Sequence, residues 1–140
     1  MNGDLLSIVV VAIVFFGAIS LVIAFAKRSR KKPLNVEAFT EKWKEAQKLC
    51  ANKETWPLAI INADNVLDEA LKKAGYRGKT MGERLVAAQR DLSDNDGVWY
   101  GHKLRNKLVH ESDTKIQEAD VKDALMGIRQ ALRDLGALKK

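Results

Sequence analysis

The stretch HKLRNKLVH, residues 102–110, gathers side chains that can transfer protons or bind anions. It contains both histidines of the chain, His102 and His110, and an adjacent Arg105–Asn106 pair. An imidazole exchanges protons near neutral pH, and a guanidinium forms paired hydrogen bonds with carboxylates and phosphates. The stretch also has the spacing of an amphipathic helix, so it is either a row of functional groups or the solvated side of a helix.

Four side chains from this region fall on one face of a helical wheel. We call them the polar row: Trp99, His102, Asn106 and His110. Leu104 and Leu108, with Tyr100 alongside, form the face that we expect to pack into the core. Arg105 lies between the two faces, about 140° around the wheel from His110. An exposed helix face is normally filled by Lys and Glu, so the polar row indicates a pocket or an interface.

Residues 105–110, RNKLVH, match the motif of the HEPN superfamily, which is an arginine, a polar residue, and a histidine after four intervening positions. In architecture the resemblance extends over roughly residues 36–136. HEPN domains are bundles of four or five helices that carry this motif on a late helix. Many of them are metal-independent endoribonucleases that act as dimers, whereas others bind nucleotides or partners without cleaving anything.

This resemblance implies roles for the motif residues in RNA cleavage. His110 would act as general base on a ribose 2′-hydroxyl or as general acid on the leaving 5′-oxygen. Arg105 would hold a phosphate oxygen and stabilise the charge that develops on phosphorus. Asn106 would orient His110 or the phosphate, because side chains at i and i+4 meet. The products would carry 2′,3′-cyclic phosphate ends, and His102, which lies outside the motif, would have a supporting role.

The sequence leaves structural explanations open for the same residues. His110 at a helix C-terminus would stabilise the helix dipole. Arg105 could pair with Asp64 or Asp68 on an earlier helix, and such a pair could also position the arginine, so we include Asp64 as a supporting residue. The alternative function is a non-enzymatic interaction module that recruits a partner through the polar row.

Metal and cofactor sites are not expected. The two histidines are eight residues apart, about 12 Å along a helix, which is too far for one metal ion. Asp94 and Asp96 fit helix capping better than a calcium loop. The glycines between residues 75 and 82 lack the pattern of a phosphate-binding loop.

The elements that must position the polar row are all predicted to be helices. Apolar residues recur at three- and four-residue spacing, and no window alternates with the period of a strand. Thr55, Thr80 and the SDNDG segment supply candidate N-caps, and Gly75 a helix end. The expected helices cover 36–52, 56–74, 81–92, a fourth helix that is capped within 93–97 and runs to about 110, and about 117–135. Short loops between them favour an all-α, antiparallel bundle of four or five helices.

Residues 5–26 form an uncharged, apolar run with only Ser7 and Ser20 as polar interruptions. A helix of this length covers the roughly 30 Å core of a bilayer. A cleaved signal peptide is the alternative, but the run is longer than a secretory apolar region and the basic residues follow it. The run therefore predicts a single-pass membrane anchor that contacts the lipid bilayer, with the N-terminus outside and the domain after it in the cytoplasm.

These boundaries divide the chain into five parts. They are a short N-terminus at 1–4, the anchor at 5–26, a basic linker at 27–35, the helical bundle at 36–136 and a tail at 137–140.

The charge of the chain is unevenly distributed. The formal net charge is +6, but the 108 residues after residue 32 carry 19 basic and 17 acidic side chains. Such a weak excess does not predict a broad nucleic-acid surface, and we expect no DNA partner. The HEPN resemblance implies RNA or a nucleotide as the ligand of a small pocket, and a homodimer formed through the bundle. Cys50 is the only cysteine, which excludes an intramolecular disulfide.

Overall fold

The computed structural model describes residues 3–26 and 32–139, with the side chains of 6–20 and 32–139. Every regular element within these residues is a helix. The α-helices are α1 (Gly3–Ala26), α2 (Val36–Lys48), α3 (Trp56–Ala74), α4 (Met81–Ala88), α5 (Asn95–His110) and α6 (Glu118–Asp134). Two short 3-10 helices, Leu49–Ala51 and Lys53–Thr55, join α2 to α3. The prediction of an all-helical fold is confirmed for the described residues.

The chain divides into two compact units, Met1–Arg30 and Lys31–Lys140. The prediction of a transmembrane helix at residues 5–26 is wrong, because no helix in the described residues is long and apolar enough to cross a membrane. The predicted single-pass topology and membrane location are therefore wrong by this finding, and the predicted lipid contact of residues 5–26 stays a prediction. Residues 27–31 of the predicted linker lie outside the described residues.

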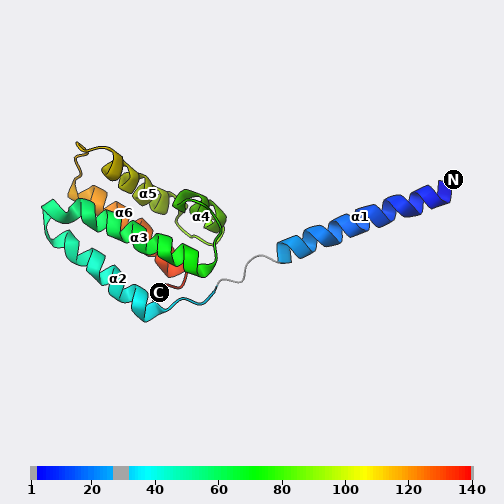
Figure 1. Ribbon diagram of the computed structural model, residues 1–140, viewed down its shortest axis with the longest axis horizontal. Helices are drawn as coiled ribbons and strands as arrows, with labels where there is room; N and C mark the ends of the chain where they lie inside the picture. The colour runs from blue at the N-terminus through cyan, green and yellow to red at the C-terminus, as the bar shows by residue number, and fades with distance from the viewer. Residues whose placement is uncertain (1–2, 27–31, 140) are drawn as a thin grey trace. The chain divides into compact units, whose positions relative to one another are not determined.

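The bundle of the second unit is arranged around α3. This helix packs against α2, α4, α5 and α6, and α5 packs along α6 (Figure 1). Fully buried apolar side chains from all of these helices fill the space between them. The largest are Phe39, Ile60, Leu67, Leu71, Leu85, Val98, Ile128 and Leu132. Removing such side chains from water is the main stabilising contribution to a bundle of this size.

Several helix ends follow the signals in the sequence. The Asn35 side chain accepts a hydrogen bond from the Ala38 amide and begins α2, and Asp94 does the same for Gly97 in α5. Gly75 ends α3 in the left-handed conformation, with φ of 96°, which a glycine adopts without strain. These signals fix the start of α2 and α5 and the end of α3, and α3 and α5 carry most of the polar pocket described below.

Two predicted caps differ in detail. Thr55 precedes α3, but its hydroxyl donates to the carbonyl oxygens of Leu49 and Asn52 and does not cap the helix. The Thr80 hydroxyl does accept from the Glu83 amide, whereas the Glu83 carboxylate accepts from the Lys79 amide. In a capping box the Glu83 side chain would accept from the amide of Thr80, the N-cap residue, but here it accepts from the amide one residue earlier.

The buried side of α5 matches the predicted one only in part, because Leu104 and Leu108 are half-buried against the core but Tyr100 is not. Tyr100 is 40% exposed and donates a hydrogen bond to Asp120, while Val98 and Gly101 are buried. A Cβ on Gly101 would lie 3.0 Å from the backbone oxygen of Ala124 and from Ile128. The absence of a side chain at Gly101 thus lets α5 lie directly on α6, which turns the polar row toward α3 and α4.

The chain after α6 also belongs to the core. Gly136 adopts a positive φ of 77°, and the chain turns back so that the Ala137 amide donates to the Leu132 carbonyl oxygen at 2.8 Å. Ala137 and Leu138 are both buried. The packed unit therefore extends beyond the boundary at residue 136 that the sequence predicts.

A polar pocket between α3, α4 and α5

A cavity of about 530 Å³ lies between α3, α4 and α5. All five residues that the sequence predicts as catalytic or supporting line it. The lining consists of Asp64, Asn65, Asp68, Thr80, Met81, Gly82, His102, Arg105, Asn106 and His110. The volume falls in the range of pockets that bind small ligands or single nucleotides.

His102 is held by Asp64 at the base of this pocket. The Nδ1 atom of the imidazole lies 3.0 Å from one carboxylate oxygen of Asp64 and 3.4 Å from the other. Asp64 is 2% exposed and His102 is 8% exposed, so water competes little for this contact. An ionised carboxylate only accepts, so with Asp64 ionised the Nδ1–H group donates a hydrogen bond to it. In the neutral ring the Nε2 atom is therefore an acceptor.

Asn106 and Arg105 continue the network along α5. The Asn106 amide nitrogen lies 3.3 Å from His102 Nε2, which fits donation to an unprotonated ring nitrogen. Its oxygen accepts a hydrogen bond from Arg105 Nη1 at 3.0 Å. Both contacts fit the same orientation of the Asn106 amide. Each hydrogen bond in the network Arg105–Asn106–His102–Asp64 therefore joins one donor to one acceptor.

Arg105 also forms an ion pair with Asp64. Its Nε atom lies 3.5 Å from an Asp64 oxygen, which is close enough for charge attraction, but this buried nitrogen makes no hydrogen bond. About 28% of the Arg105 side chain is exposed. The guanidinium thus neutralises a buried carboxylate while retaining donors that a bound anion could use.

The protonation of Asp64 reflects these competing effects. Burial raises the pKa of Asp64 above its usual value, and the hydrogen bond and charge of His102 and then the charge of Arg105 partly offset this rise. The carboxylate therefore depends on its two cationic or proton-donating neighbours to remain ionised.

His110 occupies a different environment from His102. It is the last residue of α5 and is exposed at the rim of the pocket. The next residue, Glu111, ends the helix with its amide bonded to the Lys107 carbonyl oxygen. The motif histidine is therefore accessible from solvent, and the histidine outside the motif is the one fixed by a carboxylate.

A second ion pair attaches α4 to α3 beside the pocket. Arg84 donates to one oxygen of Asp68 from Nε at 2.8 Å and to the Gly78 carbonyl oxygen from Nη1 at 2.6 Å. Burial opposes ionisation of Asp68, but the hydrogen bonds and charges of Lys72 and Arg84 outweigh it and lower the pKa of this carboxyl. Of the two aspartates that the sequence suggested for Arg105, Asp64 pairs with it and Asp68 pairs with Arg84.

Trp99 and Gly82 shape the space around the imidazole. The Trp99 and His102 rings meet edge to face, with centroids 5.9 Å apart. A Cβ on Gly82 would lie 3.9 Å from His102 Nε2 and 3.7 Å from Trp99. A side chain larger than alanine would fill this gap, so the glycine keeps the ring nitrogen open toward α4.

Some of the pocket was missing from the sequence prediction. Thr80, Met81 and Gly82 enter it because the first turn of α4 faces α5, and only the pairing of these two helices could have indicated this. Asp64 was identifiable in part, since a carboxylate among Ile60, Ala63 and Leu67 on a core-facing stripe requires a partner.

The site was also considered for metal ligands and for similarity to known proteins. Within the described residues, no cluster of three or more His, Cys, Asp and Glu side chains is placed to hold a metal ion. Comparisons with protein-family models, curated proteins and solved structures find no match for the chain.

Proposed function

We propose that this pocket binds an RNA phosphodiester and that the chain is a metal-independent endoribonuclease of the HEPN kind. The observation that carries the proposal is the Asp64–His102 pair, in which a buried carboxylate fixes the ring tautomer and leaves Nε2 as the basic nitrogen. A guanidinium within the same network supplies the donors that a phosphate requires.

Cleavage would proceed by attack of the ribose 2′-oxygen on phosphorus. His102 Nε2 takes the proton from the 2′-hydroxyl as the new P–O bond forms. Arg105 stabilises the charge on the non-bridging oxygens. The bond from phosphorus to the 5′-oxygen breaks, and that oxygen receives a proton from the imidazolium of His110. The products are a 2′,3′-cyclic phosphate and a 5′-hydroxyl.

This assignment changes the roles implied by the family motif. His110 becomes the proton donor at the rim, and His102 becomes the base. The hydrogen bond from Asn106 to Nε2 is at the long end of the usual range, so a ribose hydroxyl could replace it. Asn106 would then turn toward the phosphate while still accepting from Arg105.

A second candidate function is a binding module without catalysis. The burial of His102 and Asp64 favours it, because a satisfied polar network can also serve only to fix helix packing. The exposure of His110 and of part of Arg105 at a cavity favours ligand access instead. The two functions differ in whether RNA is cleaved.

The test is incubation of the full chain with a defined RNA in EDTA, followed by identification of the product ends. We expect cyclic phosphate ends and a loss of about 10²–10⁴ in rate for His110→Ala, because this variant lacks the proton donor. Lys103→Gln is the matched control, because it removes an exposed cation from the same helix outside the pocket. Unchanged cleavage by His110→Ala would contradict the assignment of His110 as the proton donor. Binding without cleavage by a folded chain would favour the second function.

The dimer implied by the family resemblance is part of the same proposal. Sedimentation of the same samples measures the oligomeric state. A monomer that cleaves RNA would show that one copy of the pocket is sufficient.

A further inference from the structure

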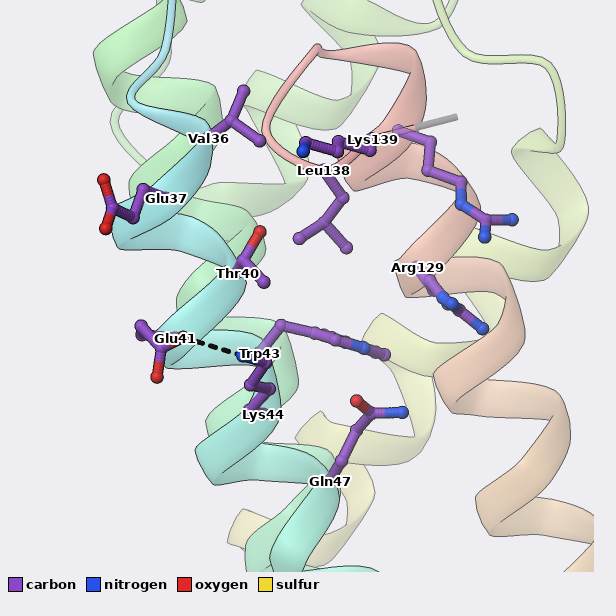
Figure 2. A pocket seen from close by; sticks show the side chains of 11 residues that line it. Val36, Glu37, Thr40, Glu41, Trp43, Lys44, Gln47, Arg129, Leu138 and Lys139 are labelled. Atoms are coloured by element: carbon purple, nitrogen blue, oxygen red, sulfur yellow. Dashed lines mark hydrogen bonds and ion pairs between the residues drawn. The ribbon is translucent and has the colours of Figure 1, made fainter.

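A second cavity, of about 680 Å³, lies between α2 and α6 and shares no residue with the polar pocket. Both helices pack against α3, which leaves a groove between them. Its walls are α2 on one side and α6 with the last turn of the chain on the other (Figure 2). The lining residues are Val36, Glu37, Thr40, Glu41, Trp43, Lys44, Gln47, Arg129, Arg133, Leu138 and Lys139.

Trp43 is the distinctive residue of this groove. Figure 2 shows its indole reaching from α2 toward the wall that carries Arg129. The side chain is only 4% exposed, yet its Nε1 has no hydrogen-bond partner in the described residues. A buried indole N–H normally finds an acceptor, because leaving it unpaired costs roughly 1–3 kcal/mol.

Arg133 presents a second unpaired donor at the same cavity. Its Nε is buried and also lacks a hydrogen-bond partner, and no ion pair with a described residue involves its guanidinium. Two donors without acceptors on facing walls of one cavity indicate that the missing acceptor comes from outside the chain.

The charges of the groove favour an anion as that acceptor. Four cationic side chains line it, those of Lys44, Arg129, Arg133 and Lys139, against the carboxylates of Glu37 and Glu41. Glu41 is already neutralised by Lys44 at 2.8 Å, an ion pair that Figure 2 marks with a dashed line. The α6 wall, in contrast, carries arginines without a carboxylate partner in the described residues.

We infer that the groove between α2 and α6 is a binding site for a small organic anion. Its carboxylate or phosphate accepts from Trp43 Nε1 and the Arg133 guanidinium, and its compact apolar body lies against Trp43, Val36 and Leu138. The inference is independent of RNA cleavage, because the groove and the polar pocket have no residue in common.

The test follows the three indole N–H signals of the full chain by NMR, with Trp43→Phe identifying the signal of Trp43. The probes are phenyl phosphate, benzoate and benzyl alcohol, which share an aromatic ring and differ in the anionic group. We expect saturable shifts of the Trp43 signal with one or both anions and none with the alcohol. The two anions distinguish a phosphate ligand from a carboxylate ligand.

Substitutions then test which side chain donates to the bound anion. Arg133→Gln should weaken anion binding by about tenfold or more, as expected for the loss of a charge-assisted hydrogen bond. Arg90→Gln, an exposed arginine outside both cavities, should leave it unchanged. The inference is overturned if no anion shifts the Trp43 signal up to about 10 mM. Equal shifts with benzyl alcohol, or unchanged affinity in Arg133→Gln, would overturn it as well.

Discussion

Asp64 determines which histidine of the polar row can act as a base. Its carboxylate lies 3.0 Å from His102 Nδ1, while His110 is exposed at the end of α5. A buried carboxylate that accepts from one ring nitrogen orients the imidazole and stabilises its protonated form. The base in the proposed cleavage is therefore assigned by the Asp64–His102 contact and only secondarily by the family motif.

Asp64→Asn should lower RNA cleavage by about 10²–10⁴ without unfolding the chain. The amide no longer stabilises a protonated imidazole, and its nitrogen can force the ring into the other tautomer. Cleavage rates and ¹⁵N chemical shifts of the imidazole measure the two effects. Asn65→Ala changes a neighbouring, exposed residue at the rim and should have a much smaller effect. Cleavage of RNA by Asp64→Asn at the wild-type rate would show that the carboxylate takes no part in the mechanism.

Asp68→Asn should destabilise the bundle by about 2–4 kcal/mol at pH 7, because it leaves the nearly buried Arg84 without its counter-charge. The native pKa of Asp68 is lowered, so its stabilising contribution is present above the ordinary value near 4 and is lost as the pH falls through the lowered value. The difference in free energy of unfolding between wild type and Asp68→Asn should therefore become smaller at acid pH. Urea unfolding at pH 7 and pH 3 measures it.

Glu69→Gln is the matched control for this prediction. Glu69 also pairs with lysines, Lys42 and Lys73, but about 32% of its side chain is exposed. Exposed pairs contribute little, so we expect a loss of at most about 1 kcal/mol. Equal losses for the two variants would contradict the importance of burial at Asp68.

At the level of residues, the sequence was sufficient to select the pocket but not to assign its chemistry. Asp64, His102, Arg105, Asn106 and His110 were all identified, and the structure brings them to one cavity. The pairing of Asp64 with His102 depends on the rotation of α5 against α3, which helical periodicity does not fix. For the same reason the choice of Asp64 over Asp68 as the partner of Arg105 stayed open.

The packing of α5 on α6 decides where the polar row points. A Cβ on Gly127 would overlap the carbonyl group of Gly97 and lie 2.7 Å from the Val98 amide nitrogen. These neighbours are backbone atoms, which cannot move aside as a flexible side chain can. The two helices can lie this close only because glycine occupies the contact.

Gly127→Ala should therefore destabilise the bundle by about 2–3 kcal/mol, more than the gain of roughly 1 kcal/mol in helix propensity. Separation of α5 from α6 should also displace the polar row and reduce cleavage. Urea unfolding is the measurement, with Gly82→Ala as control, where the nearest atom to a Cβ is 3.7 Å away. Unchanged stability of Gly127→Ala would show that the helices are not in close contact.

Helix positions were predicted more accurately than helix faces. α5 begins within the SDNDG segment and ends at His110, and Gly75 ends α3, as expected, because caps and left-handed glycines are local signals. Tyr100 was assigned to the core and is exposed, since Val98 and Gly101 make the contact with α6. The role of glycine as a contact surface is not visible in a hydrophobic pattern.

At the scale of the whole molecule, every buried apolar side chain in the described residues lies between Phe39 and Leu138. The second unit, Lys31–Lys140, therefore contains its own core. The membrane span was predicted from the apolar composition of residues 5–26. No helix in the described part of the chain is long and apolar enough to cross a membrane.

Removal of residues 1–30 should leave the unfolding of the bundle unchanged. We expect the same cooperative transition and a urea midpoint within error of the full chain, because no described core residue is lost. Circular dichroism in urea makes the comparison. A large decrease in the midpoint would mean that the first unit contributes to the core.

The assignment of His102 as the base is tested most directly by the rate of RNA cleavage in EDTA, measured for the full chain and for His102→Asn. Asparagine retains a donor for Asp64 but cannot accept a proton. We predict cleavage by the wild type to cyclic phosphate ends, and a loss of at least about 10² in His102→Asn with cooperative unfolding retained. Equal rates for the two proteins, or no cleavage by the folded wild type, would contradict the assignment of His102 as the base.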